Sequence, residues 1–192
     1  MSLLKIELNN INVQILKKGI LVTFSQNRID MVWNGFTKRT VNWEDEAITL
    51  IDQRKLPNKL VIIKCIDHHQ VVNTIKNMSI RGAPAIGAIA ALALALVAKK
   101  SKARTKNELM KELELAAKDL KATRPTGVNL FWAIQRIMNK AYSTEGKIEE
   151  IIEAIKKEAF TIIEEDIETN RAIGKNGAEI LNDGDTVLTH CK

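Results

Sequence analysis

The chain has 192 residues, of which 45% are hydrophobic, 27% charged and only 4% aromatic, and its formal net charge is +6. This composition is typical of a globular protein with an aliphatic core, and the length suits one domain, or one domain with part of another. Lysine and arginine are scattered among acidic residues without an interleaved aromatic tract, which argues against nucleic-acid binding. An anionic small-molecule ligand explains the positive excess at least as well.

The first part of the chain, residues 1–36, is predicted to be an N-terminal extension with a β-hairpin. Two apolar runs, residues 13–16 and 20–24, flank the turn Lys17-Lys18-Gly19. We treat this extension as a unit of its own in the domain organisation.

Three further strands are predicted after the extension. Residues 40–43 and 48–51 form a second hairpin around the acidic turn Glu44-Asp45-Glu46. A loop at residues 52–57 leads to the third strand, at residues 60–66. These strands predict a small antiparallel β-sheet.

The run from Ala83 to Ala98 is rich in alanine and leucine. It is too short to span a bilayer comfortably, and it ends at Lys99-Lys100, which suits a helix C-terminus. We therefore predict a buried core helix and no membrane contact. No secretory leader opens the sequence, and Cys65 and Cys191 lie far apart, so free thiols and a cytoplasmic location are expected.

Four other helices are predicted from caps and periodicity. Asp67 can cap the first of them. Another begins at the Thr105–Glu108 segment, which has the spacing of a capping box. A further helix begins at about Val128, and a long helical stretch from about Ile148 has a potential break near Asn170. The helices therefore follow the sheet as a bundle.

The last segment, residues 186–189, is a predicted strand after a turn signal. A strand after a helical domain is typical of the first strand of a parallel α/β sheet. The predicted domains are residues 1–36, residues 37–183 and residues 184–192. The fold class is α+β: a small antiparallel β-sheet followed by an α-helical bundle, ending at the first strand of a truncated Rossmann-like α/β domain.

The segment Arg81-Gly82-Ala83-Pro84 opens the apolar helix and has the features of a phosphate-binding helix start. The first backbone N–H groups of a helix have no intrahelical partner and carry the positive end of its dipole. Gly82 and Ala83 leave these groups accessible, and the Arg81 guanidinium matches phosphate geometry. The alternative is a plain turn that opens a core helix, with Arg81 in solvent.

The segment Arg124-Pro125-Thr126-Gly127 repeats this pattern before a later helix. Two such turns in one domain can place Arg81 and Arg124 at one site for an anionic ligand. Alternatively, Arg124 caps the C-terminus of the preceding helix.

Cysteine and histidine residues give weaker signals. Cys191 lies at the end of the predicted parallel strand, where open α/β sheets bind ligands, so its thiol is either a reactive group or a small buried hydrophobe. Its neighbour His190 points to the opposite face of a strand, so the two do not predict a dyad. Cys65, His68 and His69 lie close in sequence, but no third and fourth metal ligands are obvious, so a surface turn with capping residues is expected.

Five segments match one family in order and rough spacing from about residue 37 to the end. They are Leu50-Ile51-Asp52-Gln53-Arg54-Lys55-Leu56-Pro57, Ile80-Arg81-Gly82-Ala83-Pro84-Ala85-Ile86-Gly87, Arg124-Pro125-Thr126-Gly127-Val128-Asn129-Leu130-Phe131-Trp132, Asn170-Arg171-Ala172-Ile173-Gly174 and Leu188-Thr189-His190-Cys191. Together they resemble the methylthioribose-1-phosphate isomerases. The Ala-Pro-Ala-Ile-Gly form after Arg81-Gly82 favours this family over its relatives of the same fold.

The resemblance implies an aldose–ketose isomerase that converts 5-methylthioribose-1-phosphate into 5-methylthioribulose-1-phosphate in methionine salvage. It implies that Arg81, Gly82, Ala83 and Arg124 bind the phosphorylated pentose substrate and that Cys191 is catalytic. It implies no metal and no organic cofactor. The alternatives are a ribose-1,5-bisphosphate isomerase and a non-catalytic regulatory subunit of the translation-initiation exchange-factor type.

Two departures from the family pattern affect the expected activity. Lys192 stands where the family has asparagine after the cysteine. The family's catalytic aspartate and further binding residues belong to a second half, so we expect the 192-residue chain alone to be inactive. A homodimer is expected, as is common in the family, and a separately encoded C-terminal half is a second potential partner.

Overall fold

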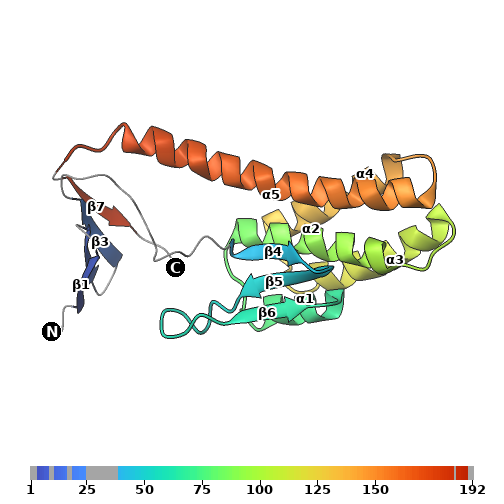
Figure 1. Ribbon diagram of the computed structural model, residues 1–192, viewed down its shortest axis with the longest axis horizontal. Helices are drawn as coiled ribbons and strands as arrows, with labels where there is room; N and C mark the ends of the chain where they lie inside the picture. The colour runs from blue at the N-terminus through green and yellow to red at the C-terminus, as the bar shows by residue number, and fades with distance from the viewer. Residues whose placement is uncertain (1–3, 9–10, 17–18, 25–38, 184, 190–192) are drawn as a thin grey trace. The chain divides into compact units, whose positions relative to one another are not determined.

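The computed structural model describes residues 4–8, 11–16, 19–24, 39–183 and 185–189 (Figure 1). The chain divides into two compact units, one made of Met1–Thr37 with Thr169–Lys192 and the other of Lys38–Glu168. The domain limits expected from the sequence stay a prediction.

The first unit contains a four-stranded antiparallel sheet in the order β1-β2-β3-β7. Its strands are β1 (Leu4–Leu8), β2 (Ile11–Leu16), β3 (Gly19–Phe24) and β7 (Thr186–Thr189). Strands β2 and β3 pair antiparallel, with Leu16 opposite Gly19, in the region where the sequence predicts the N-terminal hairpin.

The position of β7 differs from the expectation that it opens a parallel sheet. It pairs antiparallel with β3, with Val22 opposite Val187, so the start of a Rossmann-like domain is not seen in the described residues. The physical reason is that a strand must satisfy its backbone N–H and C=O groups, and the edge of β3 offers partners for them.

The second unit begins with a three-stranded antiparallel sheet, in the order β4-β5-β6. Its strands are β4 (Val41–Glu44), β5 (Ala47–Ile51) and β6 (Ile62–Cys65), which confirms the small sheet predicted from the sequence. Asp45 and Glu46 connect β4 to β5 with φ angles of 49° and 56°. Positive φ at both residues is typical of the turns that match the twist of a tight hairpin.

Five helices follow the sheet. They are α1 (His68–Lys76), α2 (Ala83–Lys100), α3 (Lys106–Lys121), α4 (Val128–Ser143) and α5 (Ile148–Ala178).

Two predicted helix caps are confirmed. The Asp67 carboxylate accepts a hydrogen bond from the backbone N–H of Gln70 at 2.8 Å and starts α1. Thr105 and Glu108 form a reciprocal capping box at the start of α3. These starts depend only on residues three positions apart, which is why the sequence predicts them.

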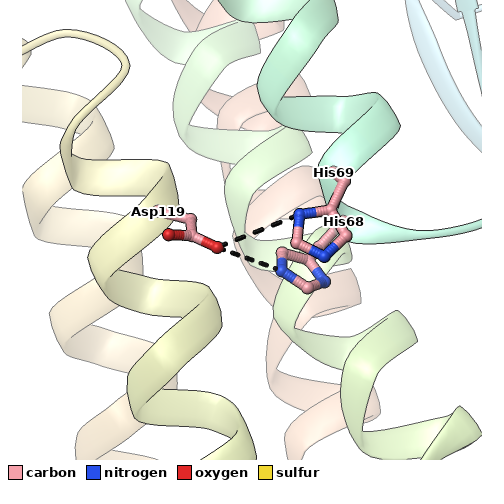
Figure 2. Close-up of side chains that lie close together, drawn as sticks. All are labelled: His68, His69 and Asp119. Carbon is pink, nitrogen blue, oxygen red and sulfur yellow. Dashed lines mark ion pairs between the residues drawn. The ribbon is translucent and has the colours of Figure 1, made fainter.

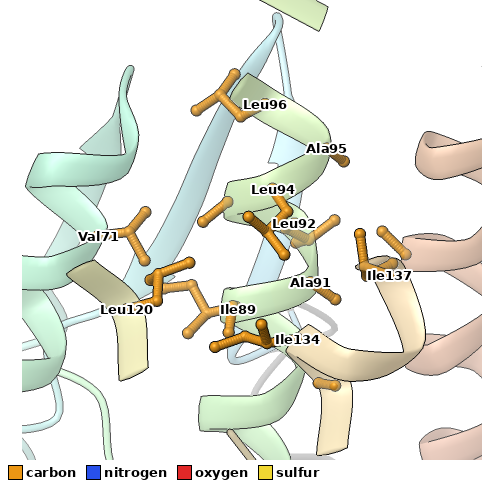
Figure 3. Close-up of a cluster of buried hydrophobic side chains, with 14 of the residues drawn as sticks. Val71, Ile89, Ala91, Leu92, Leu94, Ala95, Leu96, Leu120, Ile134 and Ile137 are labelled. Atoms are coloured by element: carbon orange, nitrogen blue, oxygen red, sulfur yellow. The ribbon is translucent and has the colours of Figure 1, made fainter. Parts of the chain in front are cut away.

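Helix α2 forms the centre of the second unit, and it contacts α1, α3, α4 and the β4–β5 hairpin. Figure 3 shows Ile89 and Leu92 of α2 among side chains of the neighbouring helices. These include Val71 of α1, Leu120 of α3 and Ile134 of α4. Helix α2 is long enough and apolar enough to cross a membrane, but 67% of its residues are buried within the protein. It is therefore a core helix, as predicted.

Helix α5 is continuous over 31 residues, so the potential break near Asn170 does not occur. A Cβ placed on Gly174 or Gly177 would have no atom within 4 Å. Glycine in a helix interior costs only about 1 kcal/mol relative to alanine, which does not suffice to end a long helix.

The Cys65 thiol on β6 is fully buried, and burial next to the negative charge of Asp67 raises its pKa to about 11. Because the thiolate is the reactive form, we expect iodoacetamide at neutral pH to modify Cys65 only after unfolding in guanidinium. Mass spectrometry of the labelled peptides checks this, and a Cys65→Ala variant should lose the denaturant-dependent label. Rapid labelling of Cys65 in the native protein would contradict it.

Candidate functional site

The start of α2 has no side-chain cap on its first backbone N–H groups. Gly82 is the N-cap residue with a φ of +96°, a region that glycine occupies without strain, and no side chain caps the helix. The Gly82 carbonyl accepts from Ile86 N–H at 3.0 Å, so the helix begins directly behind it. A Cβ at Gly82 would have no atom within 4 Å, so this helix start is open on that side. Arg81 is exposed beside it.

The loop after β5 holds the segment around Arg81 in place. The Gln53 side-chain Nε2 donates to the Arg81 carbonyl at 3.1 Å, and the Gln53 backbone N–H donates to the Ser79 carbonyl at 2.9 Å. The sequence shows this loop as a motif without indicating a role for Gln53. Its role follows from a contact between residues 28 positions apart, which no local pattern reveals.

Asp52 and Arg54 brace the same loop. Arg54 donates to both carboxylate oxygens of Asp52, from Nε to Oδ1 at 2.8 Å and from Nη2 to Oδ2 at 2.7 Å. The Asp52 residue is only 3% exposed, and its hydrogen bonds from Arg54 hold its pKa below the ordinary value. A bidentate pair of this kind restricts the loop geometrically as well as energetically.

The lowered pKa of Asp52 predicts a pH-dependent stability difference between the protein and an Asp52→Asn variant. A carboxyl whose pKa is depressed in the folded state contributes stability above its ordinary pKa of 3.8, and that contribution disappears as the pH falls through the folded-state value. Urea denaturation should therefore show the variant to be the less stable protein at about pH 6. The difference in unfolding free energy between the two proteins should shrink as the pH falls below the ordinary pKa of 3.8.

The control for this experiment is Asp45→Asn, because the Asp45 side chain is 88% exposed and lies 3.6 Å from Lys64. An exposed pair of this kind contributes little to stability. A difference for Asp52→Asn that stays constant from pH 6 to pH 3 would contradict the prediction.

The second predicted segment forms a turn at the start of α4. The Gly127 backbone N–H donates to the Arg124 carbonyl at 3.0 Å, and the Gly127 carbonyl accepts from Phe131 N–H at 3.1 Å. Gly127 is the N-cap residue and no side chain caps this helix either. Arg124 is exposed at the turn.

The two helix starts adjoin each other. A Cβ built on Gly87, one turn into α2, would lie 3.0 Å from the carbonyl oxygen of Asn129, the second residue of α4. The absence of a side chain at Gly87 therefore allows the backbones of the two helices to approach closely near their N-termini. As a result, the positive ends of both helix dipoles lie at one end of the α2–α4 pair.

The predicted binding residues Arg81, Gly82, Ala83 and Arg124 all belong to these adjoining helix starts. Their role in substrate binding stays a prediction. The predicted catalytic residue Cys191, together with its neighbour His190, lies outside the described residues.

Comparisons with known proteins agree with these motifs. Residues 79–192 match the Initiation factor 2 subunit family, and this segment includes both helix starts. The chain belongs to this family. The sequence-based resemblance to the methylthioribose-1-phosphate isomerases is likewise confirmed by curated relatives of that name. One, from Fervidobacterium nodosum, is 46% identical over 154 residues, and one from Thermosipho africanus is 47% identical over 152 residues.

Solved structures of family members show the same fold. The chain matches a 5-methylthioribose 1-phosphate isomerase from Pyrococcus horikoshii OT3 with a TM-score of 0.72 at 45% identity, over 74% of this chain and 40% of that one. It matches the translation initiation factor eIF-2B, subunit delta, from A. fulgidus with a TM-score of 0.71 at 44% identity, over 77% and 43% of the chains. The matches cover 79% of this chain but only 44% of the length of the two curated relatives.

A separate group of polar side chains consists of two histidines that precede the family-matched segment and an aspartate within that segment. His68 and His69, the first two residues of α1, lie next to Asp119 of α3 (Figure 2). Asp119 Oδ2 is 3.4 Å from His68 Nε2 and 3.9 Å from His69 Nδ1. The sequence offered no obvious third partner for these histidines, because Asp119 comes 50 residues later in the chain.

Proposed function

We propose that this chain supplies the phosphate-binding part of an aldose–ketose isomerase that converts 5-methylthioribose-1-phosphate into 5-methylthioribulose-1-phosphate. The observation that carries the proposal is the close approach of the α2 and α4 N-termini at Gly87 and Asn129. Each of these helices begins behind an exposed arginine and lacks a side-chain cap. The choice of sugar is supported by the curated relatives, which are named methylthioribose-1-phosphate isomerases.

In this proposal the phosphate of the sugar lies at the start of α2. The backbone N–H groups at Gly82 and Ala83 and the Arg81 guanidinium donate to its oxygens. Arg124 provides a second positive charge from the start of α4. A doubly charged phosphate gains from both helix dipoles and both guanidinium groups, which fits a substrate anchored by its phosphate.

The reaction itself requires acid–base chemistry. Because the phosphate occupies the anomeric oxygen, ring opening breaks the bond between C1 and the ring oxygen, which takes a proton, and leaves C1 as an O-phosphorylated oxocarbenium. Removal of the C2 proton then gives an enol, and protonation at C1 gives the ketose with the phosphate still on O1. A positioned acid and base in a pocket that excludes water suit this reaction. We assign Cys191 to this step, with a carboxylate partner from a Rossmann-like domain beyond the 192 residues. The proposal includes a cytoplasmic homodimer and neither metal nor organic cofactor in catalysis.

The binding half of the proposal is tested by titrating 5-methylthioribose-1-phosphate into the 192-residue chain. Arg81→Ala and Arg124→Ala should each weaken binding by about tenfold or more, because each removes a charge-assisted contact. Arg39→Ala is the control, since Arg39 pairs with Glu164 on the protein surface instead. Equal affinity in all three variants and the unmodified chain would exclude this site.

The catalytic half is tested by an isomerase assay on two proteins. One is the 192-residue chain, and the other is the same chain extended by the C-terminal part of a relative such as that from Fervidobacterium nodosum. We expect turnover only from the extended protein, and turnover by the 192-residue chain alone would refute the division of the site.

A second candidate function rests on the similarity to the A. fulgidus initiation-factor subunit. A regulatory subunit of that type would have no isomerase activity in the extended protein and would co-purify with partner subunits. Ribose-1,5-bisphosphate isomerisation is the third alternative, and a side-by-side comparison of the two sugar phosphates as substrates distinguishes it.

A further inference from the structure

The His68–His69–Asp119 cluster has a geometry that helix periodicity does not account for. Chain neighbours on a helix ordinarily do not face the same direction. Nevertheless, both imidazoles at the start of α1 turn toward one carboxylate of α3, and the three nearest nitrogen and oxygen atoms lie within 4.8 Å of one another (Figure 2). The cluster therefore presents three potential ligand atoms to one small volume.

Ionic pairing by itself explains this arrangement poorly. Asp119 forms an ion pair with either imidazole only when that ring is protonated, and among the described hydrogen bonds none joins Asp119 to either ring. The two ring centroids are 3.9 Å apart with an interplanar angle of 38°, so two protonated rings would repel each other at short range. Two neutral imidazoles and a carboxylate instead offer three lone pairs, which is a common ligand set for Zn²⁺.

The distances from Asp119 to the two histidines are close to those of a metal site of this kind. With metal–ligand bonds of about 2.0–2.2 Å, neighbouring ligands in a tetrahedral site lie about 3.4 Å apart. The His68–Asp119 distance of 3.4 Å already has this value. The His69–Asp119 distance is 3.9 Å and the three ligand atoms lie within 4.8 Å of one another, so the His69 ring must rotate away from the His68 ring for both nitrogens to face one ion. The His69 side chain is 71% exposed and has room for this rotation.

There is space for water ligands on the side of His69 and Asp119, while His68 lines a separate surface pocket with Asp67 and Lys100. His69 and Asp119 line an open surface cavity of about 290 Å³, which also includes Asn73 and Lys76. The positive charge of Lys76 in this cavity opposes a cation, so we expect micromolar rather than nanomolar affinity.

We propose that His68 Nε2, His69 Nδ1 and Asp119 Oδ2 bind one divalent transition-metal ion, with Zn²⁺ as the preferred ion. Water completes the coordination. The ion links the start of α1 to the last turns of α3, and it takes no part in the isomerisation proposed above. Imidazole with carboxylate favours zinc and its neighbours in the first transition row over magnesium and calcium, which prefer oxygen ligands only.

Isothermal titration of Zn²⁺ into the untagged, chelator-treated chain at pH 7.5 tests the proposal. One ion should bind per chain with micromolar affinity, and His68→Ala and Asp119→Asn should each weaken binding by at least about tenfold. The matched control is Asp45→Asn, which changes an exposed aspartate outside the cluster and should bind as the unmodified chain does. The titrations are made in a His190→Ala, Cys191→Ser background, which removes an imidazole and a thiol that could each bind Zn²⁺ outside the cluster.

Substitution by Co²⁺ gives a second readout that does not depend on affinity. A site with these nitrogen and oxygen ligands should show visible d–d absorption that His69→Ala loses. Circular dichroism of each variant establishes that a loss of binding is not a loss of folding. Absence of binding at millimolar Zn²⁺, or equal affinity in Asp119→Asn and the unmodified chain, would overturn the proposal.

Discussion

Replacing Gly87 by valine should lower the free energy of unfolding by about 3 kcal/mol, at the upper end of the usual cost of overpacking a core. A Cβ at this position would lie 3.0 Å from the Asn129 carbonyl oxygen and 3.5 Å from the Asn129 carbonyl carbon. Because the obstacle is backbone rather than a flexible side chain, α2 and α4 must move apart to admit even the first atom. Urea denaturation followed by the helical circular dichroism signal measures the effect.

The matched control is Gly174→Ala in α5. Nothing lies within 4 Å of the added Cβ there, so the substitution should leave stability unchanged or raise it by about 0.5–1 kcal/mol through helix propensity. The Gly87 variant should also bind the sugar phosphate more weakly, because separating the helix starts moves Arg81 and Arg124 relative to each other. A Gly87→Val protein as stable as the unmodified chain would show that the helices do not approach as closely as described.

Replacing Arg136 by methionine should cost about 2 kcal/mol of stability, which is the range for charge-assisted hydrogen bonds with a partly buried partner. Arg136 of α4 donates to Glu158 at 2.6 Å and to Glu165 at 2.9 Å, and both acceptors belong to α5. Its guanidinium carbon also lies 5.5 Å from the ring centroid of Trp132. Methionine keeps much of the apolar stem and removes the charge, which leaves the Glu158 carboxylate, only 18% exposed, without this partner.

Arg39→Met is the control for this second prediction. Arg39 also pairs with a glutamate of α5, at 2.6 Å from Glu164, but the two side chains are 46% and 50% exposed. Exposed pairs contribute about 0–1 kcal/mol, so Arg39→Met should lower the free energy of unfolding clearly less than Arg136→Met does. Equal effects of the two substitutions, measured by denaturation in the same buffer, would contradict the distinction between the pairs.

The elements that the sequence predicts correctly are those defined by neighbouring residues. The Asp67 cap and the Thr105–Glu108 box depend on contacts three residues apart, and the β4–β5 hairpin depends on a short turn between two apolar runs. Local hydrogen bonding is encoded in local sequence, so these expectations hold. The helix starts at Gly82 and Gly127 were likewise visible as Arg-Gly and Arg-Pro segments.

The expectations that depended on partners distant in the chain were less successful. The strand at residues 186–189 exists, but its partner is β3, more than 160 residues earlier, rather than a parallel neighbour. A strand pattern states that backbone groups need partners and leaves open which edge supplies them. The continuity of α5 past Asn170 was also not predictable from local sequence, because neither Gly174 nor Gly177 determines by itself whether a helix ends.

The sequence by itself determined the family, the helical core around residues 83–98 and the two arginine segments that open α2 and α4. Only the tertiary structure decided which of these segments meet. The contact of Gly87 with Asn129, the Gln53 hydrogen bond to Arg81 and the approach of Asp119 to His68 each join residues 28 or more positions apart. Such contacts arise from packing of the whole unit, because burial of the apolar faces sets the helix positions and the polar groups follow.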